Sequence, residues 1–157
     1  MISGGTVSGS NTLFGNQRLD PYNTHNFIVE IEGIIIGGFS EVSGLNIETE
    51  VESIKEGGAN DIEYKLPKGT KYSNITLKHG ITDFDLIWRW YDDVINGKVK
   101  RKNGSIFLCD QNGSPLVTWG FVDAYPIKLD GPSLNATTSN IATETLTLAH
   151  HGLKRIV

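Results

Sequence analysis

The chain has 157 residues, of which 38% are hydrophobic and 20% charged, and it contains 18 glycines. A chain of this length favours one domain with its own core, since folding removes about 70% of its unfolded surface from water, and the glycine content favours a β-rich fold with many turns. Fourteen Lys and Arg against eighteen Asp and Glu give a formal charge of −4, which argues against a dedicated nucleic-acid-binding protein but does not exclude a passive conduit for DNA.

Residues 1–20 are rich in Gly, Ser and Asn and hold few apolar side chains. Such a composition does not recover the entropy lost on ordering unless a partner surface receives it. We therefore predict a flexible N-terminal arm over residues 1–20, followed by a single domain over residues 21–157. The arm either has no role or orders against a neighbouring subunit on assembly, and the sequence leaves both alternatives open.

Targeting signals are not evident in the sequence. Residues 1–20 lack a basic segment followed by an apolar one, and no stretch has the ~18 consecutive apolar residues that a membrane span requires. We expect a protein that is made in the cytoplasm and does not insert into a membrane.

The first strands are predicted between residues 27 and 54. Apolar and polar residues alternate over 27–31, and Glu32-Gly33 offers a turn before the apolar run 34–36, which predicts a β-hairpin. A further strand is expected at 47–54. Two glycines and an Asn then interrupt the pattern, and we predict a long extended loop over about residues 55–72. A loop of this length between core strands suggests contacts outside the domain.

Three acidic residues, Glu48, Glu50 and Glu52, alternate along the strand 47–54 and so project from one face, with successive carboxylates about 7 Å apart. Glycosidases also use carboxylate pairs. Side by side on one strand, however, these groups do not flank a bond from two sides, so catalysis is disfavoured. A plain solvated face and the wall of a channel are the remaining alternatives.

One helix is predicted at about residues 83–96. Thr82 and Asp83 can cap its first N–H groups, and Asn96-Gly97 can end it. Leu86 and Trp90 fall away from the main apolar side, which makes them candidates for a subunit interface unless a loop of the same chain covers them. The stripe expected to pack on the core consists of Phe84, Ile87, Trp88, Tyr91, Val94 and Ile95.

Basic residues follow this helix at Lys98, Lys100, Arg101 and Lys102. They can complement the negative C-terminal end of the helix. Alternatively, they dock against an acidic partner surface. Phosphate recognition is disfavoured, because no aromatic residues interleave for base stacking.

The sequence after the basic residues predicts four more strands. Residues 105–110 and 116–122 are expected to form a hairpin joined by Asn112-Gly113, and extended segments follow at 125–129 and 141–149. The expected fold is mainly β, an antiparallel sandwich or small barrel with one helix.

No catalytic or metal-binding pattern stands out. The four histidines, at positions 25, 79, 150 and 151, lie in no nucleophile context and lack metal-ligand spacing. The single cysteine, Cys109, cannot form an internal disulfide and lies in an apolar run, which favours a buried thiol. We expect no enzymatic activity, no metal and no cofactor.

Several short motifs carry a family resemblance, because they occur together and in one order. The chain resembles the tail tube family of contractile phages, which bacterial contractile injection systems also use and to which the haemolysin-coregulated tube proteins of type VI secretion are related. The resemblance covers roughly residues 22–155. The motifs are Phe39-Ser-Glu-Val-Ser-Gly-Leu45, Glu56-Gly-Gly58, Leu66 to Tyr72, Ile75 to Lys78, Trp88-Arg-Trp90, Gly97 to Arg101, Trp119 to Pro126, Gly131 to Ala136 and Glu144 to His150.

The resemblance implies a structural subunit. Such subunits form hexameric rings that stack into a tube, whose inner wall is a continuous β-barrel. The implied partners are other copies of the chain, a contractile sheath, baseplate and spike proteins, a tube terminator or cap, and effector cargo or, in a phage tail, DNA. Assembly is expected in the bacterial cytoplasm, and function in a phage tail-like particle that is cell-anchored or released.

The resemblance also suggests roles for three sets of residues. Glu48, Glu50 and Glu52, with Thr143, Thr145 and Thr147, are candidates to face the channel. The basic residues Lys98, Lys100, Arg101 and Lys102 are candidates to dock against a partner ring or the sheath. Candidates for the subunit or ring interface are Lys55, Glu56, Tyr64, Leu66, Lys68, Lys71, Tyr72, Leu86 and Trp90.

A different class of function is a monomeric β-sandwich that binds carbohydrate or another ligand. Trp88, Trp90 and Trp119 would serve it if they were exposed together on one concave face, although helical periodicity predicts that Trp88 packs in the core.

Overall fold

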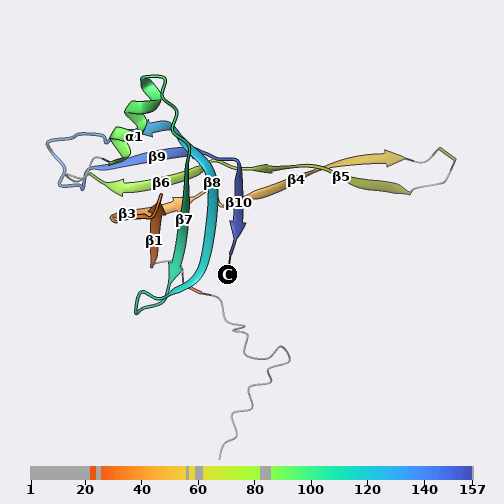
Figure 1. Ribbon diagram of the computed structural model, residues 1–157, viewed down its shortest axis with the longest axis horizontal. Helices are drawn as coiled ribbons and strands as arrows, with labels where there is room; N and C mark the ends of the chain where they lie inside the picture. The colour runs from red at the N-terminus through yellow and green to blue at the C-terminus, as the bar shows by residue number, and fades with distance from the viewer. Residues whose placement is uncertain (1–21, 24–25, 56, 59–61, 82–85, 157) are drawn as a thin grey trace, which may run out of the picture.

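The computed structural model describes residues 22–23, 26–55, 57–58, 62–81 and 86–156. The predicted N-terminal arm, residues 1–20, lies outside this range. The described residues form the helix α1 (Leu86–Ile95) and ten strands (Figure 1). The strands are β1 (Phe27–Ile31), β2 (Ile34–Ile36), β3 (Phe39–Ser43), β4 (Ile47–Lys55), β5 (Glu63–Tyr72), β6 (Ile75–Gly80), β7 (Lys102–Cys109), β8 (Pro115–Asp130), β9 (Thr143–Ala149) and β10 (Gly152–Arg155).

The main sheet is antiparallel and has the strand order β2-β1-β7-β8-β9-β6-β3, with β10 paired to β8 beside this path. Strand β8 has 16 residues and belongs to both halves of the sheet, because its first part pairs with β7 and its last part with β9. Asp123 lies just before the junction of these parts and has a positive φ of 53°. The sheet therefore divides into two layers whose strands cross (Figure 1).

The two layers enclose the core, and the predicted mainly β fold with antiparallel sheets and one helix is confirmed. In β6, Ile75 and Leu77 are fully buried, as are Leu146 and Leu148 in the neighbouring β9. The terminal strands β2 and β3 do not pair with each other. In the part of the chain that the structure describes, the sheet is thus an open sandwich, and the alternative of a small closed barrel is not observed.

Both hairpins predicted from Gly-containing turns are confirmed. Glu32-Gly33 joins β1 to β2 with φ angles of 53° and 78°, the two positive values that a type I′ turn requires. Between β7 and β8, Gly113 has a φ of 82°. The Asp110 carboxylate accepts hydrogen bonds from the backbone N–H groups of Asn112 and Ser114, both at 2.9 Å.

Helix α1 ends where the sequence predicts. Gly97 has a φ of 79° and donates its N–H to the carbonyl of Val94, and the N–H of Lys98 bonds to the carbonyl of Asp93. These bonds satisfy carbonyls that would otherwise lack partners at the end of the helix. The proposed caps, Thr82 and Asp83, lie outside the described residues.

The buried face of α1 was predicted in part, since Ile87 is buried and Tyr91 packs against the core, but the positions of the two tryptophans were predicted wrongly. Trp90 is 3% exposed and belongs to the core, whereas Trp88 is 52% exposed. The apolar residues of this helix occupy a wider arc than one sheet can cover, so periodicity did not determine which part would be buried. The indole N–H of Trp90 donates to the carbonyl of Lys100 at 2.8 Å, and this bond removes the cost of burying the indole N–H.

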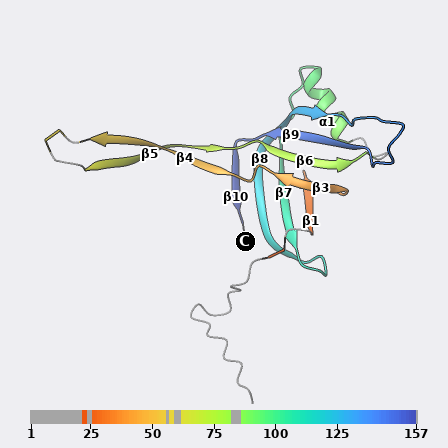
Figure 2. The ribbon, with the colours of Figure 1, turned by 180° about the vertical axis from the view of Figure 1, so that it is seen from behind.

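The segment predicted as a long loop is largely a strand. Glu63–Tyr72 forms β5 and pairs with β4 over the register Ile47↔Tyr72 to Lys55↔Glu63. Together β4 and β5 form a two-stranded hairpin that projects far from the sandwich (Figures 1 and 2). We call it the projecting hairpin. It continues the β3–β6 pair outward, because β4 follows β3 and β6 follows β5 in the chain.

Candidate assembly interface

The projecting hairpin has a charged section near the sandwich. Glu48 lies opposite Lys71 in the register, and Glu52 lies opposite Leu66. Lys71 also donates a hydrogen bond to Glu50, and this bond and the charge of Glu50 raise the pKa of Lys71. Lys68 lies 3.9 Å from Glu52. Because these pairs are exposed, they contribute little to stability, and their main effect is to keep this section hydrophilic.

One face of the outer section of the projecting hairpin carries apolar side chains that are open to solvent. Ile54 lies opposite Tyr64 in the register, so the two share a face, and Leu66 follows two residues later on the same strand. Each of the three side chains is more than two-fifths exposed. Ile47 and Val51 are exposed on the opposite face. A two-stranded hairpin alone is marginally stable, and contiguous exposed apolar residues mark interaction surfaces. The hairpin therefore has the character of a surface that another chain covers.

The predicted interface residues separate into two groups. Lys55, Tyr64, Leu66, Lys68, Lys71 and Tyr72 all lie exposed on the projecting hairpin, whereas Glu56 lies outside the described residues. Trp90 is buried in the core of its own chain and so is not available to an interface, whereas Leu86 packs partly against the same core. The exposed apolar side chains of α1 are instead Trp88 and Ile95.

The residues predicted to face a channel lie on two different sheets. Glu48, Glu50 and Glu52 are exposed on the projecting hairpin. Thr143, Thr145 and Thr147 lie on β9, where they alternate with buried residues and so point away from the core. Their neighbours on adjacent strands are also polar, namely Thr76, Lys78, Lys128 and Asp130. The outer face of this layer is thus hydrophilic and rich in hydroxyl groups.

Three of the four basic residues after α1 contact their own chain. Lys100 lies 3.3 Å from Asp93 in the last turn of the helix. The Lys102 ammonium lies 5.4 Å from the centre of the buried Trp90 ring. Arg101 lies 2.8 Å from a ring nitrogen of His151 and stacks over Tyr125. The Lys100 contact agrees with the first alternative, that the basic residues complement the C-terminal end of the helix.

A buried polar cluster that the sequence did not reveal joins three elements. His79 on β6 and Glu144 on β9 are direct register partners and are 7% and 5% exposed. The His79 Nε2 atom lies 2.9 Å from Glu144 Oε1, a close polar contact that is not aligned as a hydrogen bond. The indole N–H of Trp88 on α1 donates to the other Glu144 oxygen at 3.2 Å. The cluster thus links the helix to the sheet.

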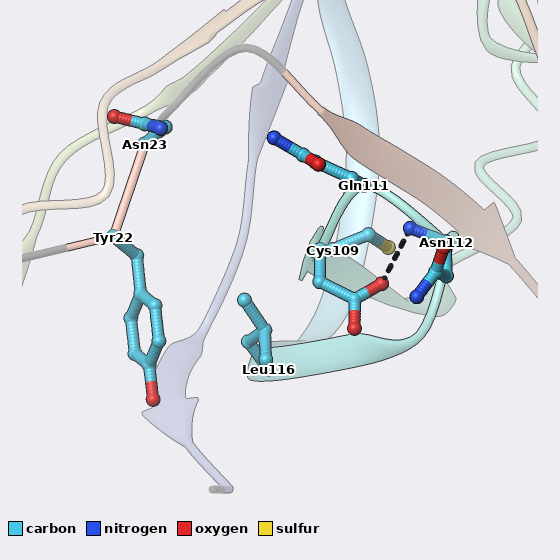
Figure 3. A pocket seen from close by; sticks show the side chains of 7 residues that line it. Tyr22, Asn23, Cys109, Gln111, Asn112 and Leu116 are labelled. Carbon is cyan, nitrogen blue, oxygen red and sulfur yellow. Dashed lines mark hydrogen bonds between the residues drawn. The ribbon is translucent and has the colours of Figure 1, made fainter. Parts of the chain in front are cut away.

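A shallow cavity of about 280 Å³ lies beside the β7–β8 turn (Figure 3). Its lining includes Tyr22, Cys109, Asp110 and Leu116. Burial and the neighbouring charge of Asp110 both raise the pKa of the Cys109 thiol. A nucleophilic cysteine requires a lowered pKa, so the direction of this shift is opposite to the one that activates a thiol.

The raised pKa predicts that the Cys109 thiol is alkylated slowly. At pH 8, the folded protein should react with iodoacetamide at least about tenfold more slowly than the same chain in urea, because the thiolate is the reacting form. Mass spectrometry of the alkylated chain over time measures both rates. Equal rates in the two states would show that Cys109 is neither buried nor raised in pKa.

The described residues hold no group of three or more His, Cys, Asp or Glu side chains placed to bind a metal ion. None of their helices has the length and apolar character needed to cross a bilayer.

The three tryptophans do not share a face, since Trp90 is buried, Trp88 lies on α1 and Trp119 packs partly against the core. This separation removes the basis for a carbohydrate-binding face.

Comparison with protein families gives a match over residues 23–154, to the family described as T4-like virus tail tube protein gp19. The chain belongs to this family. It is a tail tube protein, of the kind that phage tails and contractile injection systems share. Among curated proteins, none matches this sequence.

Solved structures give the same family and fold. The tube protein is 28% identical to a chain of the sheath-tube complex of the PVC extracellular contractile injection system, with a TM-score of 0.79 and coverage of 96% of this chain and 98% of that one. A chain of the anti-feeding prophage cap is 27% identical, with a TM-score of 0.81 and coverage of 93% and 97%. Hcp1 from Flavobacterium johnsoniae is 16% identical, with a TM-score of 0.52 and coverage of 83% and 94%, and shows likeness of fold alone.

Proposed function

We propose that this tube protein forms hexameric rings that stack into the inner tube of a contractile injection system and enclose a channel for effector cargo. The observation that carries the proposal is the projecting hairpin. It exposes apolar residues on both faces and reaches about 30 Å from the sandwich, at about 3.3 Å for each of its ten β5 residues. A monomer gains nothing from such an element, whereas a ring or tube covers it. A phage tail tube that conducts DNA is the alternative within the same family.

The channel wall is proposed to include the hydrophilic face of β9, with Thr143, Thr145 and Thr147, and the acidic row Glu48, Glu50 and Glu52. The neighbours of the threonines in the register support this assignment, because Lys78 and Lys128 are balanced by Glu41 and Asp130. A wall of hydroxyl groups with balanced charge offers cargo neither an apolar nor a strongly charged surface to adhere to.

The proposed partners are a contractile sheath, baseplate and spike proteins, and a terminating cap. Similar chains occur in a PVC sheath-tube complex, in an anti-feeding prophage baseplate and in an anti-feeding prophage cap. Lys98 and Lys100 remain exposed after the contacts described above, so they are available to an acidic partner.

We propose assembly in the bacterial cytoplasm and function in a phage tail-like particle. We propose no enzymatic activity, since the family is one of tube subunits.

Negative-stain electron microscopy of the purified protein, over a series of protein and salt concentrations, tests the proposal. Rings or tubes with a central channel are the expected result. Monomers under every condition, including with purified baseplate as a nucleus, would overturn it.

The projecting hairpin should be required for assembly but not for folding. The triple variant Ile54→Ser, Tyr64→Ser, Leu66→Ser should raise the protein concentration needed for assembly more than about 100-fold, because burying each side chain contributes on the order of 1 kcal/mol or more. Sedimentation velocity measures assembly, and circular dichroism verifies the fold.

The matched control alters the other face of the same hairpin. Thr49 and Thr70 face each other there and are exposed. A Thr49→Ser, Thr70→Ser variant should assemble like the unaltered protein. If the triple variant also assembles normally, the hairpin is not the assembly element.

A further inference from the structure

The projecting hairpin joins the sandwich through two short connections. Residues 44–46 lead from β3 to β4, and residues 73–74 lead from β5 to β6. The two connections are bonded to each other, because the N–H of Ser73 donates to the carbonyl of Asn46 at 3.3 Å. The direction in which the hairpin leaves the sandwich (Figures 1 and 2) therefore depends on how these few residues are held.

The two connections differ in how they can be fixed to the sandwich. The first contains Leu45, which packs partly against the core. The second consists of Ser73 and Asn74, both polar and exposed, and it precedes the fully buried Ile75. An apolar contact cannot hold the second connection, so its side of the hairpin base requires a polar one.

His150 supplies a polar contact at this place. It comes directly after β9, and its side chain is half-buried. Its Nε2 atom lies 2.8 Å from the carbonyl oxygen of Ser73. Since a carbonyl can only accept, Nε2 carries the proton and donates. The ring also lies beside the ring of Tyr72, with their centres 5.8 Å apart. One side chain of the sandwich thus contacts the last residue of β5 and the residue after it.

The other ring nitrogen of His150 shows that this placement has a cost. Its Nδ1 atom is buried and has no hydrogen-bond partner among the described residues. A buried polar atom without a partner disfavours the placement of the ring. The Ser73 bond and the Tyr72 contact offset that cost. The adjacent His151, in contrast, has a side chain that is 57% exposed.

Resting on the proposed function, we propose that His150 is a positioning residue for assembly. It holds the projecting hairpin of the free subunit in one orientation before a neighbouring subunit covers it. A hairpin that is already oriented loses less conformational freedom when subunits associate. A hairpin that swings about its base is competent for assembly only part of the time, and the apparent affinity falls by that fraction. His150 therefore promotes assembly from within its own chain.

Single-molecule fluorescence energy transfer in the full chain tests the orientation. In a Cys109→Ser background, dyes are attached at Glu63→Cys, at the outer end of the hairpin, and at Ile35→Cys on β2, two exposed positions. The labelled chain is refolded and measured at picomolar concentration, so that subunits do not associate. With His150 present, the distribution of transfer efficiency should be narrow.

Two variants of His150 and one control separate the hydrogen bond from general packing. His150→Phe keeps an aromatic ring but cannot donate to Ser73, so it should broaden the distribution. His150→Gln should narrow it again, because the amide N–H can reach the same carbonyl. His151→Ala is the control, since His151 lies near Asp123 of the sandwich, and it should leave the distribution unchanged. Circular dichroism verifies that each variant is folded.

The same variants link the orientation to assembly. His150→Phe should raise the protein concentration needed for tube formation about fivefold, the factor expected for one lost hydrogen bond, and His150→Gln should restore much of the loss. Sedimentation velocity measures this concentration. An unchanged concentration for His150→Phe despite a broadened distribution would overturn the role in assembly.

The outcomes for the inference and for the proposed function are distinct. A distribution that is as narrow in His150→Phe as in the unaltered chain, or one that is already broad in the unaltered chain, would overturn the inference and leave the proposed function standing. Absence of tubes from an unaltered chain whose distribution is narrow would instead count against the proposed function.

Discussion

Replacing Gly44 with alanine should destabilise the fold by at least about 3 kcal/mol. Gly44 joins β3 to β4 with a φ of 87°, and a Cβ atom there would lie 1.9 Å from the carbonyl oxygen of Asn74. The obstacle is backbone rather than a movable side chain, so the two segments at the base of the projecting hairpin must separate. Urea unfolding followed by circular dichroism gives the change in free energy.

Gly38 provides the control for Gly44. It has a similar φ of 83°, but a Cβ atom there meets nothing within 4 Å. Gly38→Ala should therefore cost only the strain of holding alanine in a left-handed backbone conformation, about 1–2 kcal/mol. The difference in unfolding free energy between the two variants then gives the cost of the clash at Gly44. Equal losses for both variants would show that the approach of Asn74 to Gly44 is not tight.

Replacing Glu144 with alanine should cost about 3 kcal/mol or more, because it leaves His79 buried without its partner. The substitution also removes the acceptor of the Trp88 indole N–H. The loss should therefore appear both in the free energy of unfolding, measured in urea, and in the fluorescence of the folded state, since Trp88 changes its surroundings.

Two further variants separate the causes of this loss. Asp130→Ala removes an exposed carboxylate on the adjacent strand β8 and should change stability by less than about 1 kcal/mol. The double variant His79→Leu, Glu144→Met should recover much of the loss, because replacing both members of a buried pair by apolar groups is often nearly neutral. A double variant that is no more stable than Glu144→Ala would mean that the loss does not come from leaving His79 without its polar neighbour.

The buried pair gives α1 its position. Besides the Trp88 bond, the helix makes polar contacts through Trp90, through Asp93, which lies 3.3 Å from Lys100, and through Tyr91, whose hydroxyl donates to the carbonyl of Ile127 at 3.1 Å. Because β9 carries Glu144 inward and its threonines outward, the same strand connects the helix to the hydrophilic face that we propose for the channel.

The local elements were predictable from the sequence because their signals are local. Glu32-Gly33 and Asn112-Gly113 specify their turns through backbone conformations that few residues adopt, and Gly97 ends the helix for the same reason. Alternation over 27–31 and 141–149 indicates strands without reference to any other part of the chain. The ordered motifs between Phe39 and His150 carried the resemblance to tail tube proteins, which the family match over residues 23–154 confirms.

Contacts between distant residues were decided only by the tertiary structure. The segment 63–72 contains Pro67 and Gly69, which are typical of a loop, but pairing with β4 makes it a strand. Trp88 was expected in the core and Trp90 outside it. In the structure α1 packs on β8 with Trp90 buried and hydrogen-bonded to Lys100, and Trp88 is the exposed tryptophan of the helix. His79 and Glu144 are 65 positions apart, and only the register of β6 with β9 brings them together. Periodicity assigns residues to a face, whereas the choice of buried face depends on which partner surface covers it.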